Sequence, residues 1–145
     1  MKKINTFHIQ WHITEICNLR CKHCYQNSFN QKELTLIQIE KIFQNLTDFV
    51  NKPNQHLIVD ITGGEPLLHP NFWHICETLE KNDTVEEFGI ITNGTLLKKD
   101  TVEKITSYRK FKTIKISCEG SEKDCFEHIR PFAYTGFLDI LKLIS

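Results

Sequence analysis

The sequence has no excess of charge of either sign and no long hydrophobic segment. Its 18 basic and 18 acidic residues give a formal net charge of zero, whereas proteins that bind nucleic acid or anionic membranes usually carry a basic excess. No apolar run reaches the roughly 20 residues of a membrane-spanning helix, and no apolar signal core follows the two amino-terminal lysines. We therefore expect a cytoplasmic protein that binds neither nucleic acid nor a membrane.

Linkers, low-complexity tracts and sequence repeats are also missing, and 145 residues suffice for one domain with a hydrophobic core. Apolar side chains recur with the period of a strand and with the period of a helix in alternating segments. Thr35 with Gln38, and Asp100 with Glu103, have the spacing of a helix-capping box. The predicted strands are Phe7–Ile13, Leu57–Ile61, Glu87–Ile91 and Thr113–Ser117, and the predicted helices are Leu34–Val50, Asn71–Glu80, Asp100–Tyr108 and about Tyr134 to Ser145.

This order of elements, a strand followed by a helix four times, predicts a single α/β domain over residues 1–145. Strands that alternate with helices form parallel sheets, and this number of units forms an arc of a (βα) barrel rather than a closed one. We therefore expect a partial (βα) barrel with a parallel sheet. Ligands bind such folds at the carboxyl ends of the strands, so polar residues that directly follow the strands are candidates for a functional site.

The first of these loops contains Cys17, Cys21 and Cys24 within eight residues. In a reducing compartment, cysteines are more often metal ligands or small buried residues than disulfides. Three thiolates on one loop leave one coordination position of a metal centre open. Two hypotheses fit this pattern: a four-iron, four-sulfur (4Fe-4S) cluster with one free iron, and a structural zinc site with His23 as the fourth ligand.

The loop after the second predicted strand contains Gly63, Gly64 and Glu65. Glycine has no Cβ atom, so the backbone of this loop can approach a small molecule closely. The Glu65 carboxylate is a partner for a cation such as an α-ammonium group. The loop therefore suits a ligand that carries such a group.

Polar residues also follow the third and fourth predicted strands. Thr92 and Asn93 have hydrogen-bonding groups that either contact a polar ligand or hold the neighbouring loop. Ser117 and Glu119 are two residues apart at a strand end, so we expect their side chains to point the same way. A hydroxyl and a carboxylate together suit a ribose diol or an amino-acid moiety.

Together these motifs resemble those of the radical S-adenosylmethionine (radical SAM) superfamily. The cysteines have the C-x3-C-x2-C spacing of its cluster motif, and Gly63-Gly64-Glu65-Pro66 resembles its GGE motif. The resemblance extends from about Phe7 to the end of the chain. The family's third- and fourth-strand motifs resemble Thr92-Asn93-Gly94-Thr95 and Ser117-Cys118-Glu119-Gly120. Within the family, the peptide- and sulfatase-maturing (SPASM-like) branch has a stretch similar to His128-Ile129-Arg130 followed by Gly136-Phe137.

This resemblance implies an enzyme with two cofactors, a 4Fe-4S cluster and S-adenosyl-L-methionine (SAM). In this family SAM chelates the open iron, an electron from the reduced cluster cleaves SAM, and the resulting 5′-deoxyadenosyl radical abstracts hydrogen from a peptide or small molecule. A flavodoxin- or ferredoxin-like protein would supply the electron. By resemblance the cluster ligands are Cys17, Cys21 and Cys24, and the SAM-binding residues are Gly63, Gly64, Glu65, Tyr25, His23, Thr92, Asn93, Ser117, Glu119 and Arg130.

The resemblance also assigns several of these residues to parts of SAM. The two glycines and Glu65 would hold the methionine amino group, and Arg130 would reach the methionine carboxylate. Ser117 and Glu119 would contact the ribose or the carboxylate of SAM, and His23 and Tyr25 would lie near its adenine.

The chain departs from the family pattern in one motif and in length. Glu119 stands where the family usually has aspartate, which keeps the charge but adds a methylene group. We expect about four of the roughly six βα units usual in the family, without the additional C-terminal cysteine domain of many peptide-maturing relatives. We therefore expect an exposed fourth-strand edge; one hypothesis is that a second chain or a homodimer covers it, and another is that the chain is a truncated product. Alternative hypotheses are a truncated, non-catalytic remnant or accessory subunit that binds both cofactors, and a zinc-stabilised structural domain.

Three further cysteines lie outside the cluster motif. Cys76 lies in a predicted helix, where we expect a small buried apolar residue. Cys118 and Cys125 belong to no second cluster motif, and the sequence assigns them no role.

Overall fold

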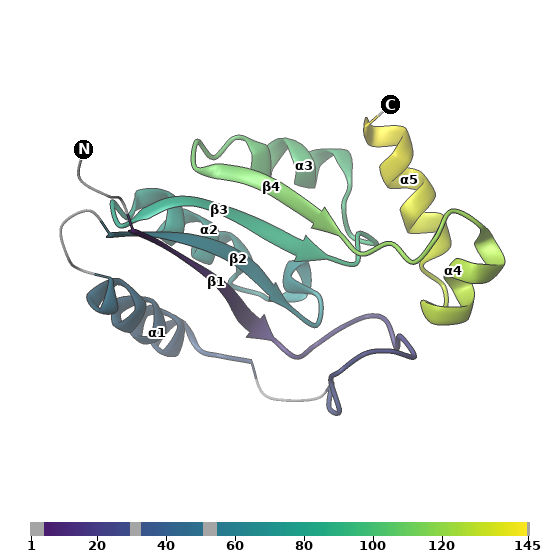
Figure 1. Cartoon of the computed structure of the whole chain (residues 1–145), viewed down its shortest axis with the longest axis horizontal. Coiled ribbons are helices and arrows are strands. Elements are labelled where there is room, and N and C mark those ends of the chain that lie inside the picture. Colours follow the sequence, from purple (N-terminus) through teal and green to yellow (C-terminus); the bar gives the residue numbers. More distant parts are fainter. Residues whose placement is uncertain (1–4, 30–32, 51–54, 145) are drawn as a thin grey trace.

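The computed structural model describes residues 5–29, 33–50 and 55–144 and contains the expected alternation of strands and helices (Figure 1). Ser145, the last residue of the predicted final helix, lies outside the described residues. The strands are β1 (Asn5–Thr14), β2 (Gln55–Gly63), β3 (Val85–Thr92) and β4 (Phe111–Ile116). The helices are α1 (Leu36–Phe49), α2 (Phe72–Lys81), α3 (Lys99–Thr106), α4 (Lys123–Ile129) and α5 (Tyr134–Ile144), with a short 3-10 helix, η1 (Pro66–Leu68).

The described strands form one parallel sheet in the order β1-β2-β3-β4. The predicted fold class, a parallel α/β partial barrel, is therefore confirmed. Each strand pairs with the strand that precedes it in the sequence, and a helix connects the two. All four carboxyl ends consequently lie at one edge of the sheet, where the loops that follow the strands meet (right-hand side of Figure 1).

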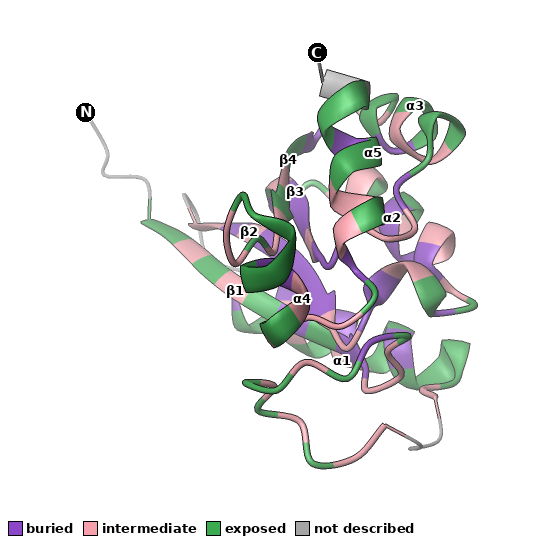
Figure 2. Ribbon diagram, turned by 90° about the vertical axis from the view of Figure 1, so that its right-hand side faces the viewer, coloured by how far each residue is buried: buried purple, intermediate pink, exposed green. Residues whose placement is uncertain are grey.

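Helices α1, α2 and α3 pack with one face of the sheet to form the main hydrophobic core. In β1 the alternate residues Trp11 and Ile13 are buried, as the strand pattern predicts, and Trp11 stacks on Phe43 of α1 with ring centroids 6.2 Å apart. Buried residues concentrate in the sheet and on the inner sides of the helices (Figure 2). Burial of each large apolar side chain stabilises the fold by roughly 1.5–3 kcal/mol.

The two predicted capping boxes have different outcomes. At α1 the Thr35 hydroxyl accepts a hydrogen bond from the Gln38 N–H at 3.3 Å, and Gln38 Oε1 accepts one from the Thr35 N–H at 2.9 Å, which confirms the prediction. The predicted box at Asp100 and Glu103 is wrong, because α3 begins at Lys99 and Asp100 lies in its first turn. At that position the carboxylate interacts favourably with the positive end of the helix dipole instead of capping the helix.

Helix α4 has no counterpart in the elements predicted from the sequence. It has seven residues and one buried side chain, Phe126, and no side-chain hydrogen bond caps its start. So short a helix has no periodic apolar stripe from which it could be predicted. No helix within residues 5–29, 33–50 and 55–144 is long and apolar enough to cross a membrane.

The face of the sheet opposite these helices carries a charged network that joins three strands. Asp60 of β2 has a side chain that is 2% exposed, and its Oδ2 accepts a hydrogen bond from Lys115 of β4 and lies 2.7 Å from His8 Nε2 of β1. Lys115 reaches Asp60 across β3 at Gly89. A Cβ atom at Gly89 would lie 3.1 Å from Asp60 Oδ1 and 2.2 Å from Thr113 Oγ1, so the missing side chain leaves room for this ion pair.

We expect the Asp60→Asn variant to be less stable than the wild type at neutral pH by about 1–3 kcal/mol, because Lys115 and His8 lose their charged, buried acceptor. Burial raises the pKa of Asp60, but the hydrogen bonds and charges of Lys115 and His8 outweigh it and hold the pKa below the ordinary 3.8. The stabilisation is therefore present above that pH and is lost as the pH falls through the lower pKa of the folded state.

Urea unfolding of both proteins at about pH 7 and about pH 2.5 measures this difference, which we expect to shrink at the lower pH. The matched control is Asp83→Asn, which changes an exposed carboxylate in a turn. A stability difference for Asp60→Asn that is the same at both pH values would contradict the prediction.

Candidate functional site

The cysteine loop follows β1 at the carboxyl edge of the sheet and is held by local contacts. The Cys24 N–H donates to Cys21 O at 3.1 Å, and the Leu19 N–H donates to Cys17 Sγ at 3.4 Å. Leu19 is buried in a second small core with Phe126 of α4. Cys17 and Cys21 pack against this core, and the three thiols of the loop are free and half-buried.

A pocket of about 150 Å³ lies between this loop and the sheet edge. It is lined by residues that follow β1 and by residues at the ends of β2, β3 and β4, so the structure brings the predicted motifs together. All the predicted site residues line it except Glu65 and Glu119. The lining residues are Cys17, Leu19, Cys21, His23, Cys24, Tyr25, Gln26, Thr62, Gly63, Gly64, Ile91, Thr92, Asn93, Ser117 and Arg130.

Gly63 and Gly64 let the end of β2 lie against the start of the cysteine loop. A Cβ atom on Gly63 would be 2.2 Å from Thr14 O, and one on Gly64 would be 2.3 Å from Ile16 O. The same approach forms hydrogen bonds from the Gly64 N–H to Thr14 O at 2.8 Å and from the Glu65 N–H to Ile16 O at 2.9 Å. In the structure the missing Cβ atoms make room for the backbone of the cysteine loop, and the close approach of the two glycines to a small molecule stays a prediction.

The Glu65 side chain is fully buried and surrounded by hydrogen-bond donors. Its carboxylate accepts hydrogen bonds from Thr92 Oγ1 at 2.8 Å, from the Asn93 N–H at 2.9 Å and from the Leu67 N–H at 3.2 Å. Burial raises the pKa of Glu65, while these donors act in the opposite direction. The carboxylate therefore joins the end of β2 to the end of β3, and its contact with an ammonium group stays a prediction.

Asn93 connects the end of β3 to the cysteine loop. Its Nδ2 donates to Asn18 Oδ1 at 2.9 Å and lies 3.8 Å from Cys17 Sγ, and its Oδ1 accepts from the Thr95 N–H at 2.9 Å. Of the two roles that the sequence leaves open for Thr92 and Asn93, these contacts support holding the neighbouring loop. The sequence does not single out Asn18, because a polar residue in a loop is too common a signal.

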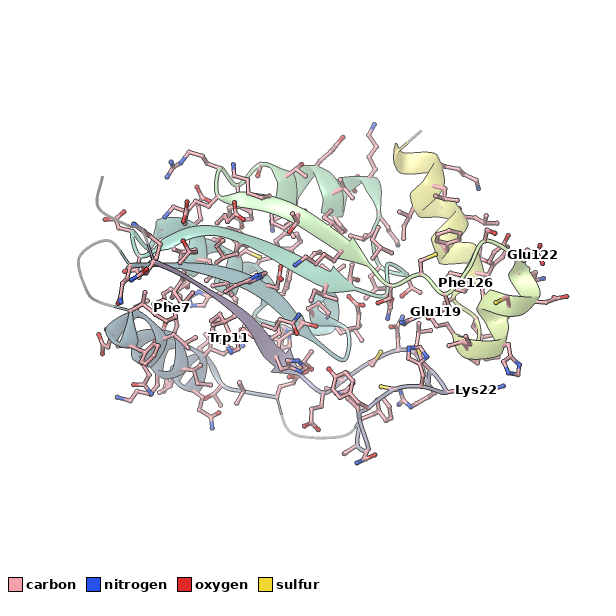
Figure 3. All side chains as sticks on the ribbon, viewed as in Figure 1. Phe7, Trp11, Lys22, Glu119, Glu122 and Phe126 are labelled. Carbon is pink, nitrogen blue, oxygen red and sulfur yellow. The ribbon has the colours of Figure 1, made fainter. Side chains whose placement is uncertain are left out.

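Ser117 and Glu119, which follow β4, have different surroundings. Ser117 lines the pocket, whereas Glu119 lies between the cysteine loop and α4 (Figure 3). Glu119 Oε1 accepts a hydrogen bond from Arg130 Nε at 2.7 Å and forms a salt bridge with Arg130 Nη2, also at 2.7 Å. Arg130 Nη1 lies 3.4 Å from Cys21 Sγ. Because β4 ends at Ile116, the alternation expected of a strand does not determine how these two side chains are placed.

Tyr25 and Gln26 lie between this pocket and a larger one of about 460 Å³. The Tyr25 side chain is exposed, and its hydroxyl lies 3.3 Å from His12 Nδ1. His23 lines the smaller pocket, and its Nε2 lies 3.7 Å from Glu119 Oε1. Small-molecule sites usually measure about 300–1,000 Å³, so the smaller pocket suits a compact group and the larger one a part of an organic ligand.

The donor set of the smaller pocket decides what kind of centre it suits. Burial raises the pKa of the Cys17 and Cys21 thiols, and for Cys21 the nearby Arg130 acts in the opposite direction. Among the described residues, no group of three or more His, Cys, Asp or Glu side chains is placed to hold a metal ion. What favours a metal centre is that three free thiols line one pocket, the number of cysteines that bind an iron–sulfur cluster when one of its irons is left open.

Comparison with protein families gives a match over most of the chain. The sequence model of the radical SAM superfamily matches residues 11–145. The antilisterial bacteriocin subtilosin biosynthesis protein AlbA of Bacillus subtilis is 31% identical over 142 residues, which are 95% of this chain and 30% of AlbA. GTP 3′,8-cyclase of Pasteurella multocida is 33% identical over 99 residues, which are 65% of this chain and 28% of the cyclase.

Solved structures show the same fold. Two crystal structures of Streptococcus suis SuiB, one bound to S-adenosylmethionine and one bound to the precursor peptide SuiA, match with TM-scores of 0.66 and 0.65 and identities of 22% and 21%. Each match covers 88% of this chain and 27% of SuiB. The chain thus spans less than a third of the length of the curated relatives named above.

Proposed function

Because the chain belongs to the radical SAM superfamily, we propose that it binds one 4Fe-4S cluster and SAM and cleaves SAM reductively for hydrogen abstraction from a substrate. The family that the motifs predict is confirmed, and its homologues are enzymes. The observation that supports the proposal best is the pocket in which three free thiols of one loop meet the ends of β2, β3 and β4. When bound, the cluster supplies the electron for cleavage, and SAM supplies the 5′-deoxyadenosyl radical.

Cys17, Cys21 and Cys24 would bind the cluster, each thiolate at a different iron. Their loop is held in place by backbone hydrogen bonds to the end of β2 and by Asn93 of the β3 end. A loop that is already positioned loses less conformational entropy when it takes up its ligand. The sheet edge thereby favours cluster assembly without contributing a ligand of its own.

We assign the methionine amino group of SAM to the backbone at Gly63 and Gly64, which line the pocket beside the thiols. Glu65 contributes mainly through the strand end that it holds, because its hydrogen-bond donors already occupy most of the roughly four acceptor sites of a carboxylate. The exposed ring of Tyr25, at the boundary of the two pockets, offers a surface on which an adenine stacks. Ser117 then lies in position for a hydroxyl contact to the ligand.

We propose a peptide as the substrate. AlbA is named as a bacteriocin biosynthesis protein, and one SuiB structure holds its precursor peptide, which supports this class. An electron donor of the flavodoxin or ferredoxin type is part of the same proposal. Within the described strands β4 is an edge of the sheet, where a further chain would pair.

Anaerobic reconstitution with iron and sulfide tests this function. We expect about four irons and about four sulfides per chain, and an electron paramagnetic resonance (EPR) spectrum of the reduced cluster that changes when SAM is added. Dithionite with SAM should then produce 5′-deoxyadenosine. An intact cluster that does not cleave SAM would support the alternative of a non-catalytic accessory subunit, and bound zinc without iron or sulfide would overturn the cluster assignment.

A further inference from the structure

The guanidinium group of Arg130 lies against one of the three thiols of the pocket. Its Nη1 is 3.4 Å from Cys21 Sγ, within reach of an N–H···S hydrogen bond, although the two residues are 109 positions apart in the sequence. The Arg130 side chain is 11% exposed, so water screens its charge weakly at this place. A fixed cation therefore stands beside Cys21.

Glu119 holds the guanidinium group in this position. Nε and Nη2 of Arg130 both lie 2.7 Å from Glu119 Oε1, which leaves Nη1 free to face the sulfur of Cys21. A hydrogen bond from Nε and a salt-bridge contact from Nη2 to the same carboxylate oxygen together define the direction of the third nitrogen of this planar group. The arrangement is therefore an oriented contact between Arg130 and the thiol.

Helix α4, which ends just before Arg130, is itself fastened to the cysteine loop. The Lys22 N–H donates to Ile129 O at 3.0 Å, and Phe126 packs with Leu19 in the small core. Figure 3 shows Lys22, Glu119 and Phe126 at this junction of loop and helix. The backbone on both sides of the contact between Arg130 and Cys21 is thus held in place.

We propose that Arg130 is a positioning residue that raises the reduction potential of the cluster through a hydrogen bond and a positive charge at the Cys21 sulfur. Reduction adds a negative charge to the cluster, so a fixed cation and a donor to a ligand sulfur stabilise the reduced form more than the oxidised form. Glu119 opposes part of this effect with its own charge while it orients the guanidinium group. The inference rests on the proposed cluster and concerns a contact that exists without SAM.

The test is the midpoint potential of the reconstituted cluster, measured without SAM by an EPR-monitored redox titration. In Arg130→Gln we expect the ratio of reduced to oxidised cluster at a given solution potential to fall about tenfold, which is about 59 mV for one electron. Arg130→Lys keeps the charge and should recover part of the shift. Arg20→Gln is the matched control, because this exposed guanidinium in the same loop bonds to the backbone oxygen of Cys17 at 2.7 Å and should leave the potential nearly unchanged.

The outcomes separate this inference from the proposed function. A complete cluster in Arg130→Gln with the wild-type potential would overturn the inference and leave the cluster assignment intact, whereas a wild-type protein that takes up no iron and sulfide would overturn the function itself. If Arg130→Gln does not assemble a cluster, the midpoint potential of the cluster in Glu119→Gln tests the inference instead. This variant keeps an oxygen that accepts from Arg130 and removes the opposing charge, so its potential should rise; an unchanged potential would overturn the inference.

Discussion

Replacement of Cys21 by alanine is expected to abolish cluster assembly, so that the reconstituted variant retains less than about a tenth of the iron and sulfide of the wild type. The variant keeps two of the three thiols of the loop, so one iron of the cluster would lose its cysteine ligand. The charge and hydrogen bond of Arg130 also lose their partner in this variant. Iron and sulfide analysis after anaerobic reconstitution measures the loss.

The chain offers matched controls for this experiment outside the cluster motif. Cys118 and Cys125 are exposed, and their replacement by alanine should leave the iron and sulfide content unchanged. Cys76 is fully buried, as the sequence predicts, and burial raises its pKa to about 12, so it is a protonated core residue at neutral pH. A full cluster in Cys21→Ala would contradict the ligand assignment, and loss of the cluster in Cys118→Ala would point to a second ligand set.

Replacement of Glu65 by alanine is expected to lower the free energy of unfolding by about 3 kcal/mol or more, because several buried donors lose their acceptor at once. The hydroxyl of Thr92 and the N–H groups of Asn93 and Leu67 all donate to this carboxylate. The end of β3 would then no longer be held, and with it the contact between Asn93 and the cysteine loop. Urea unfolding measures the stability, and equilibrium dialysis of the reconstituted protein measures SAM binding.

Two further variants sharpen this prediction. Glu65→Gln keeps one oxygen but turns an amide NH2 group toward donors, so we expect about half of the loss in stability. Glu86→Ala, on the exposed side of β3, should change stability by less than about 0.5 kcal/mol. If Glu65→Ala were as stable as the wild type and failed only in SAM binding, Glu65 would be a direct contact to the ligand, as the GGE resemblance implies, rather than a link between two strand ends.

The sequence predicts the order and type of most elements because apolar periodicity is a local property of each segment. The burial of Trp11 and Ile13 on one face of β1 and the capping box at Thr35 are read correctly for this reason. Prediction failed where the local signal was weak or misleading. Helix α4 has one buried side chain and no side-chain cap, and α3 begins at Lys99, ahead of the residue with the best capping chemistry.

The candidate site was predictable in its composition but not in its contacts. Parallel strands place their carboxyl ends at one edge, so the residues that follow β2, β3 and β4 meet the cysteine loop wherever the strand order is read correctly. The partners of each residue at this edge depend on the distances and directions of side chains. Gly64 packs against the backbone of Ile16, and Glu119 accepts a hydrogen bond from Arg130. No residue spacing in the sequence indicates either contact.

The sequence by itself determined that three thiols share one loop, since that depends on residues at most seven positions apart. It also determined a parallel α/β fold, since alternating periodicities admit few other architectures. Only the tertiary structure decided that Glu65 holds the end of β3, 28 positions away, and that Arg130 stands beside Cys21, 109 positions away. These contacts arise because packing of the core and of α4 brings distant segments within hydrogen-bonding distance, and hydrogen bonds act only over that range.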